Sequence, residues 1–264
     1  MKSEGDSNSR PSQEQKGDDS TREAVAVVAR SSTRPALVTS PSSPAPLLSS
    51  APVSCSLRLL PTPPHTATYG HVAALAKAIA EGVNATQGVR AKLFRVRETL
   101  PKDVLAKMHA PPTPADDDPA HPPVLSDPKD LAQADGIIFG GPTRFGGFPT
   151  QLRAVFDATG GLWQSGALAG KPAGLFCSVG TQGGGSETTL LTALPYLAHQ
   201  GMLFVPIGYT AGSAMFGMEQ VRGGNPYGAT TFAGSDGSRQ PTQEELMIAA
   251  HQGSYFAGVV KRLG

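Results

Sequence analysis

The sequence has little excess charge and few cysteines. Lys and Arg number 22 against 21 Asp and Glu, so the formal net charge of +1 gives no basic field that would attract nucleic acid or an acidic membrane. The two cysteines, Cys55 and Cys177, lie in a polar region and in a predicted strand, so a framework disulfide is not expected. Small-molecule chemistry in a reducing compartment is the expectation from this composition.

Several signatures of catalysis and targeting are also absent. The sequence has no nucleophile motif, no Walker A run and no clustered Cys and His, which argues against hydrolase, NTPase and metal-dependent functions; no residue is assigned a catalytic role. No apolar stretch approaches the ~18 to 20 residues needed to cross a bilayer. The amino terminus carries Lys2, Glu4 and Asp6 with no apolar core behind them, so we expect a cytoplasmic protein without a transmembrane segment.

Composition divides the chain into two parts. Residues 1–66 are crowded with Ser, Pro, Thr and charged residues and are predicted to be a disordered tail. Residues 67–264 are rich in Gly, Ala, Leu and Val and alternate helix-like with strand-like segments, which predicts one α/β domain.

Hydrophobic periodicity predicts the order of elements in that domain. Helices are expected at 71–84, over a segment that ends at 131–135, around 151–156 with an end at Gly160-Gly161, at 187–200 and at 243–263. Strands are expected at 91–96, 136–140, 173–179 and 202–207. This order predicts a doubly wound parallel sheet. The expected first strand is missing or replaced, because Leu57 to Leu60 is short and precedes a proline-rich run at 61–64.

Two glycine-rich loops follow successive predicted strands. Residues 140–147 (GGPTRFGG) come directly after one strand, and residues 180–185 (GTQGGG) follow the next. Ligands of open α/β sheets bind where parallel strands end, and glycines let backbone N–H groups approach a ligand closely. Arg144 adds a charge and Phe145 a flat apolar face, a combination that suits a flat, polar-edged, anionic cofactor.

Several ordered segments resemble one family. The sequence is similar to the WrbA-type NAD(P)H:quinone oxidoreductases, which are flavodoxin-like FMN proteins, at residues 140–146, 159–163, 198–199, 205–209, 222–231 and 234–241. The resemblance spans about residues 67–264. It implies bound FMN, NADH or NADPH as electron donor, two-electron reduction of a quinone, and assembly as a homodimer or homotetramer.

The resemblance assigns three FMN-binding segments and one further residue. The phosphate would lie on Ala67, Thr68, Tyr69, Gly70, His71 and Val72, and the flavin ring on Thr143, Arg144, Phe145, Ser178, Val179, Gly180, Thr181, Gln182, Gly183 and His199. Tyr69 and Trp163 would border the nicotinamide and quinone. The family has Ser where this chain has Ala67, and losing one hydrogen bond to a charged group costs about 1.5 to 3 kcal/mol.

Each assignment has a plainer alternative. Glycine-rich turns are often only surface turns, a lone histidine near a helix end usually caps or packs, and Trp163 can be a core residue. Arg222, Asp236 and Arg239 lie in polar loops and are assigned no chemistry.

Two alternatives to the enzymatic function stay open, and the origin of residues 1–66 is also open. Ala67 and the missing strand also suit a non-enzymatic flavodoxin-like scaffold or assembly protein that binds FMN weakly. A one-electron carrier is less favoured, because Trp163 suggests room for a stacked substrate. The unusual composition of residues 1–66 would be explained if the gene's amino-terminal coding region were wrongly predicted. Sequencing the 5′ end of the transcript decides between the two origins. The physiological quinone and the choice between NADH and NADPH stay open.

Overall fold

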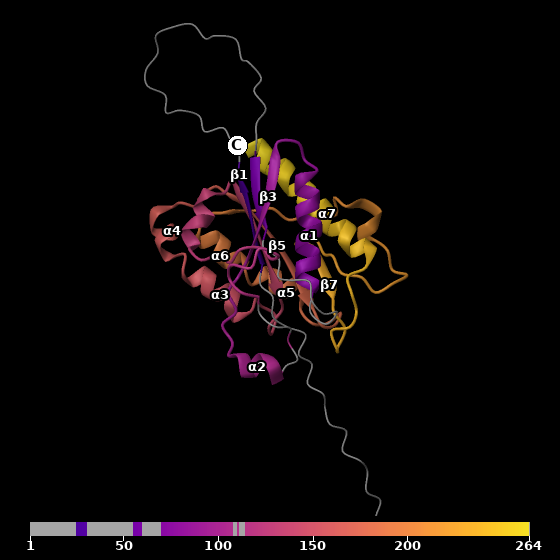
Figure 1. Cartoon of the computed structure of the whole chain (residues 1–264). Coiled ribbons are helices and arrows are strands. Elements are labelled where there is room, and N and C mark those ends of the chain that lie inside the picture. The colour runs from indigo at the N-terminus through magenta and orange to yellow at the C-terminus, as the bar shows by residue number, and fades with distance from the viewer. Residues whose placement is uncertain (1–24, 31–54, 60–69, 108–109, 111–113, 264) are drawn as a thin grey trace, which may run out of the picture.

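The computed structural model describes residues 25–30, 55–59, 70–107, 110 and 114–263. A central sheet lies between two layers of helices, with α1 and α7 on one face and α3, α4, α5 and α6 on the other (Figure 1). The strands are β1 (Val25–Arg30), β2 (Cys55–Leu59), β3 (Val89–Arg95), β4 (Gly136–Pro142), β5 (Pro172–Val179), β6 (Leu203–Phe204) and β7 (Thr230–Phe232). The helices are α1 (His71–Asn84), α2 (Lys102–Lys107), α3 (Thr150–Asp157), α4 (Gly160–Ser165), α5 (Ser186–Leu191), α6 (Leu194–His199) and α7 (Gln243–Leu263), with 3-10 turns η1 (Pro128–Gln133) and η2 (Gly212–Met215).

The parallel part of the sheet is centred on β5. The pairs β4–β5, β5–β6 and β5–β7 are all parallel, and helices cover both faces, which confirms the predicted doubly wound arrangement. Both β4 and β5 are buried along their whole length, because each runs between two helical layers. Pro142 pairs with Ser178, so these two strands end at the same level and release their loops side by side.

Two short strands, β6 and β7, occupy the same position in the sheet beside β5. β6 pairs with the start of β5 at Pro172 and Ala173, whereas β7 pairs with its end at Cys177 to Val179. The predicted strand at 202–207 is therefore wrong in extent: pairing stops at Phe204, two residues before Pro206, which has no N–H to donate. Residues 205–229 leave the sheet, lie beside α7, where Thr210 Oγ1 is 2.8 Å from His251 Nε2, and return at Thr230.

The helices α1 and α7 were both predicted with the observed limits. Leu75, Ile79 and Val83 recur on one side of α1 and are fully buried. α7 begins with a capping box, because Thr242 Oγ1 accepts from Glu245 N at 3.2 Å and Glu245 Oε2 accepts from Thr242 N at 2.8 Å. Among the described residues, no helix is both long enough and apolar enough to cross a membrane.

The opposite helical layer corrects two predicted boundaries. The predicted helix at 187–200 is two helices, because Pro195 in the first turn of α6 cannot donate the hydrogen bond that would continue α5. The Gly160-Gly161 pair does not end α3, which stops at Asp157, but begins α4. Phe156 of α3 stacks on Tyr196 of α6 at 3.9 Å between ring centroids, which joins the two halves of this layer.

Two short strands lie within the region predicted as a tail. β1 is antiparallel to β3 and to β4 and lies between them, and β2 is parallel to β3. The segment rejected as a first strand, Leu57 to Leu60, thus contributes to β2, which ends at Leu59 just before the prolines. Most of the predicted tail, 1–66, lies outside the described residues, and its disorder stays a prediction.

Close packing of α1 against α7 generates the first testable prediction. A Cβ on Gly82 would lie 1.8 Å from the carbonyl oxygen of Ala250, and one on Gly253 would lie 2.0 Å from that of Ile79. Backbone atoms cannot move aside, so Gly82→Ala and Gly253→Ala should each lower the free energy of unfolding by about 1 to 3 kcal/mol or more.

The matched control is Gly160→Ala in α4, where an added Cβ meets nothing within 4 Å. Alanine is a better helix former than glycine, so this variant should be unchanged or more stable by up to about 1 kcal/mol. Urea unfolding followed by circular dichroism compares the three variants. Equal stability of Gly82→Ala and Gly160→Ala would contradict the packing described.

Candidate functional site

The two predicted flavin-ring loops meet at the ends of β4 and β5. Thr143 N donates to Ser178 O at 2.8 Å, which extends the strand pairing one residue beyond Pro142 and fixes the first loop against the second. Gly140 allows this pairing, because a Cβ there would lie 2.1 Å from the ring of Phe176. The structure therefore brings Thr143 and Ser178 together as expected for neighbouring parallel strands.

The loop after β4 makes a tight turn that presents Phe145. Arg144 N donates to Gly147 O at 2.7 Å, and Gly147 N donates to Arg144 O at 3.0 Å. Phe145 has φ of 51°, in the left-handed region that non-glycine residues rarely adopt, and its side chain is fully exposed. Such a backbone conformation typically costs on the order of 1 kcal/mol or more and clusters at ligand sites.

Thr189 hydrogen-bonds to this loop, and the sequence analysis did not predict it as a site residue. Its fully buried Oγ1 lies 2.7 Å from Thr143 Oγ1 and 2.7 Å from the carbonyl oxygen of Gly185. The contact joins the first turn of α5 to the residue that opens the Arg144 loop. A threonine in the first helical turn after a glycine-rich loop was the available signal, but nothing local indicated that it reaches the other loop.

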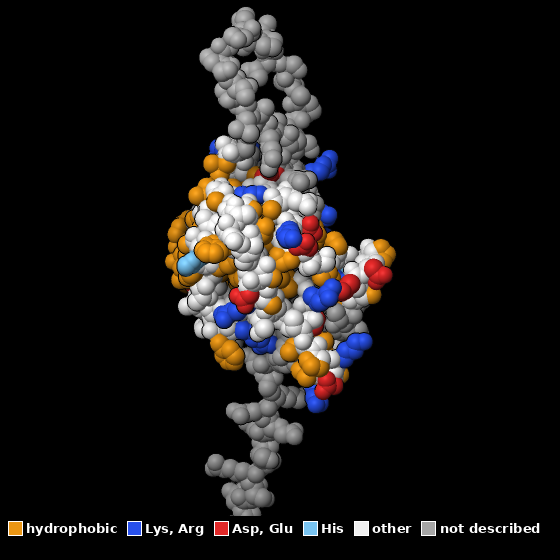
Figure 2. All heavy atoms as spheres, turned by 90° about the vertical axis from the view of Figure 1, so that its left-hand side faces the viewer, with side chains coloured by type: hydrophobic (Ala, Val, Ile, Leu, Met, Phe, Trp, Pro, Cys, Tyr) orange, Lys and Arg blue, Asp and Glu red, His pale blue; other side chains and the backbone are white. Residues whose placement is uncertain are grey.

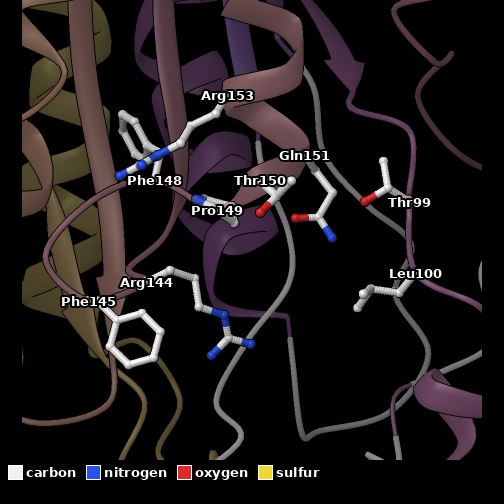
Figure 3. Close-up of a pocket in the computed structure, with 9 residues that line it drawn as sticks. All are labelled: Thr99, Leu100, Arg144, Phe145, Phe148, Pro149, Thr150, Gln151 and Arg153. Atoms are coloured by element: carbon white, nitrogen blue, oxygen red, sulfur yellow. The ribbon is translucent and has the colours of Figure 1, made fainter.

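A pocket of about 460 Å³ opens beside Arg144. Its walls are Thr99 and Leu100 after β3, Arg144 and Phe145, and the start of α3 (Figure 3). In the close-up, Arg144 extends from its loop toward the middle of the pocket, whereas Arg153 extends past Phe148 and away from Arg144.

Glu98 organises the far wall of this pocket. Its Oε1 accepts from Thr99 N at 2.8 Å, Leu100 N at 2.9 Å and Gln151 Nε2 at 2.6 Å. The wall is thus held by hydrogen bonds between the loop after β3 and the start of α3.

The predicted phosphate segment is described only from Gly70 onward; Ala67, Thr68 and Tyr69 lie outside the described residues. Gly70 precedes the first turn of α1, a helix of 14 residues, and a Cβ there would meet nothing within 4 Å. In the part of the chain that the structure describes, no side chain caps α1, and its first turn has no acidic residue. The first N–H groups of α1 are therefore available to an anion.

His71 is the first residue of α1 and is buried. Its Nε2 lies 2.7 Å from the backbone oxygen of Arg239, and because a carbonyl oxygen only accepts, Nε2 carries the proton. Burial lowers the pKa of His71 below its ordinary value of 6.5; the backbone hydrogen bond acts in the opposite direction, and the nearby Arg239 charge lowers the pKa further. The imidazole is thus held neutral in a defined tautomer.

The second glycine loop follows β5 and faces solvent. Val179 is buried and its carbonyl oxygen accepts from Ala233 N at 2.8 Å, which places β7 and the following residues beside the loop. Thr181, Gln182 and Gly183 are exposed, and Gly184 N closes a turn onto Thr181 O at 2.9 Å. The loop thus offers accessible backbone groups next to Thr143.

The structure does not bring Trp163 and His199 to these loops within one copy of the chain. Trp163 lies on α4, which follows α3 as the chain returns to the amino end of β5, and its side chain is 60% exposed. His199 ends α6 four residues before β6 begins and is also exposed. Both residues therefore lie toward the opposite edge of the parallel strands, and their predicted roles stay predictions.

The described residues fit a flavin nucleotide. An uncapped helix amino terminus suits a phosphate, and two adjoining loops with exposed backbone groups, one guanidinium and one exposed ring suit a flat heterocycle with polar edges. Cys177 offers no reactive thiolate, because complete burial raises the pKa of its thiol. Among the described residues, no group of three or more His, Cys, Asp or Glu could hold a metal ion.

Known proteins resemble this chain in sequence over the same region. The sequence model of a family described as NADPH-dependent FMN reductase matches residues 66–215. A protein named quinone-oxidoreductase QR2 from Triphysaria versicolor is 56% identical over 196 residues, which cover 74% of this chain and 92% of that protein. A protein named probable NAD(P)H dehydrogenase (quinone) FQR1-like 2 from Arabidopsis thaliana is 54% identical over 195 residues, covering 74% and 69%.

A WrbA-like flavodoxin protein from Agrobacterium tumefaciens aligns with a TM-score of 0.49 and 22% identity over 74% of this chain and 92% of that one.

The lowered pKa of His71 generates a testable prediction for stability. Below pH 6.5 the unfolded chain takes up a proton on this imidazole more readily than the folded chain, so acidification should favour unfolding until the folded-state pKa is also passed. Thermal unfolding between pH 7.5 and 5.5 should therefore show a smaller fall of Tm in His71→Gln than in the wild type. Parallel Tm profiles for the two proteins would show that His71 is not held neutral.

Proposed function

The chain belongs to the NADPH-dependent FMN reductase family, and from this premise we propose that it is an FMN-dependent enzyme that reduces quinones with NADH or NADPH, two electrons at a time. The observation that carries the proposal is the identity of 56% and 54% to two proteins named as quinone reductases. The contact between Thr143 N and Ser178 O supports the proposal, because it joins the two loops that would hold the flavin.

When bound, FMN supplies the two-electron redox chemistry that amino-acid side chains lack. The N–H groups at the start of α1, at Gly70, His71 and Val72, would hold the phosphate. Thr143, Arg144 and Phe145 of the first loop and the backbone of Ser178 to Gly183 of the second would hold the ring, with Arg144 as a hydrogen-bond donor and Phe145 as an apolar face. The protein thus contributes binding and orientation.

We further propose that Trp163 and His199 reach the flavin of another copy of the chain in a homodimer or homotetramer. Trp163 on α4, Leu191 on α5 and Leu203 on β6 expose apolar surface, and Figure 2 shows apolar side chains at several places on the side of the molecule that carries α3, α4 and α6. A second copy would cover these side chains. The cytoplasmic location predicted from the sequence stays a prediction.

The proposed activity has a direct test. Purified full-length protein should be yellow, release FMN on denaturation and oxidise NADH or NADPH in the presence of benzoquinone, with no reaction when the quinone is left out under anaerobic conditions after one turnover. Arg144→Ala should lose most of the rate, because its guanidinium lines the pocket, and circular dichroism of the variant checks that the fold is kept. A folded, colourless protein without activity would instead support the non-enzymatic scaffold.

Sharing of the site between copies has a separate test. Trp163→Ala and Arg144→Ala should each be poorly active alone, whereas co-expression should restore part of the activity, because mixed assemblies contain sites with both native residues. Met247→Ala, a 51% exposed residue on α7 at the other face, serves as the control and should keep the native KM for the quinone. A monomer in sedimentation velocity, or no restoration in the mixture, would contradict shared sites.

A further inference from the structure

Glu245 is a fully buried carboxylate in the first turn of α7. Its Oε1 accepts from Gly223 N at 2.6 Å, and its Oε2 accepts from Thr231 Oγ1 and from Thr242 N, each at 2.8 Å. A carboxylate removed from water needs such donors and a countercharge. Glu245 therefore holds together the segment at 222–231, β7 and the start of α7.

Arg239 supplies the countercharge through a two-pronged contact. Its two terminal nitrogens lie 3.1 Å from Glu245 Oε1 and 3.2 Å from Glu245 Oε2, in the bidentate arrangement that fixes both groups. The same guanidinium donates to the carbonyl oxygens of Phe232 at 2.6 Å and Val221 at 2.8 Å. With Thr231 Oγ1 at 3.4 Å, five acceptors on three segments set the position of Arg239.

The backbone of Arg239 is held at the FMN end of the molecule. Arg239 N donates to Ala233 O at 2.9 Å, and Ala233 N donates to Val179 O, where the second glycine loop begins. Arg239 O accepts from Nε2 of His71, the first residue of α1, at 2.7 Å. The loop at 233–239 therefore contacts both the helix end that would hold the phosphate and the strand that leads to the flavin ring.

We propose that Arg239 and Glu245 are positioning residues for the phosphate of the flavin nucleotide, acting through His71 on the amino terminus of α1. This inference rests on the proposed function, because it takes FMN as the ligand. Among the described residues, no side chain caps α1, so the hydrogen bond from His71 to the Arg239 carbonyl is the tether at this end. Hydrogen bonds from N–H groups to an anion depend strongly on direction, so a small rotation of the first turn weakens phosphate binding.

The network also gives a role to two segments of the sequence to which no chemistry was assigned. The segments 222–231 and 234–241 both carry the resemblance to the WrbA-type proteins, yet neither contains a residue expected to touch the cofactor. Gly223 must be small, because a Cβ there would lie 2.0 Å from Thr230 O. Its N–H donates a hydrogen bond to Glu245 Oε1. Both segments converge on the Arg239–Glu245 pair.

The test compares FMN with riboflavin, which has the same ring and no phosphate. Apo-protein of full length is titrated with each flavin, and binding is read from the quenching of flavin fluorescence. Arg239→Gln should weaken FMN by about tenfold, the loss expected for one misaligned charge-assisted hydrogen bond, and leave the affinity for riboflavin unchanged. Arg239→Lys, which keeps a cation beside Glu245, should recover part of the loss.

Two further variants make the test independent of folding. His71→Leu breaks the tether but keeps the Arg239–Glu245 pair, and His71→Gln restores a donor near the position of Nε2; the first should lose FMN affinity selectively and the second should regain it. Lys261→Gln is the matched control, because Lys261 lies in the last turn of α7, away from Glu245, and donates to the carbonyl oxygen of Gln87 at 3.1 Å. It should bind both flavins like the wild type.

The outcomes separate this inference from the proposed function. Equal losses for FMN and riboflavin in Arg239→Gln and His71→Leu would indicate a general structural role and overturn the inference, as would unchanged FMN binding in both. Either result would leave quinone reduction intact as the proposed function. A wild-type protein that binds riboflavin and FMN equally would also overturn the inference, whereas one that binds neither would overturn both.

Discussion

The close contact between α1 and α7 is the constraint on which the rest of the structure depends. Gly82 and Gly253 let the two helices approach until their backbones touch, and no larger residue fits there without moving one helix away from the sheet. Since α7 also carries Glu245 in its first turn, this packing sets where the loop at 233–239 can lie. The phosphate end of the proposed cofactor site is therefore fixed by helix packing far from any ligand-contacting residue.

The site is built almost entirely from backbone groups and from side chains that orient them. Thr143, Ser178 and Val179 act through main-chain hydrogen bonds, and the buried Thr189 hydroxyl connects two loops. In such a site the reactivity comes from the cofactor, and the protein determines its position and surroundings. Such a site needs few reactive side chains, which is consistent with the absence of nucleophile and metal-binding motifs from the sequence.

Local patterns predicted the elements that are long and periodic, and failed where distant contacts decide. α1 and α7 were predicted with the observed limits, because each has an apolar stripe and clear ends. The break before Pro195 and the early end of β6 at Phe204 were not predicted, because the prediction followed the apolar pattern across each proline. A proline has no N–H to continue a helix or a strand. Arg239 was assigned no chemistry, since nothing in its neighbourhood in sequence reveals that its carbonyl meets His71, 168 positions away. Trp163 and His199 were predicted from resemblance alone, and they lie on α4 and α6, away from the two glycine-rich loops of their own chain.

β6 and β7 both pair with β5, one at its start and the other at its end, and the chain between them leaves the sheet. Pairing with β5 begins at Leu203, stops after Phe204 and resumes at Thr230. The part of the intervening segment around Phe216 and Met218 is exposed and can change without disturbing the pairing with β5, whereas Gly223 is held by Glu245. The exposed part gives the fold a place where recognition of partners or substrates can diverge while the cofactor end is kept.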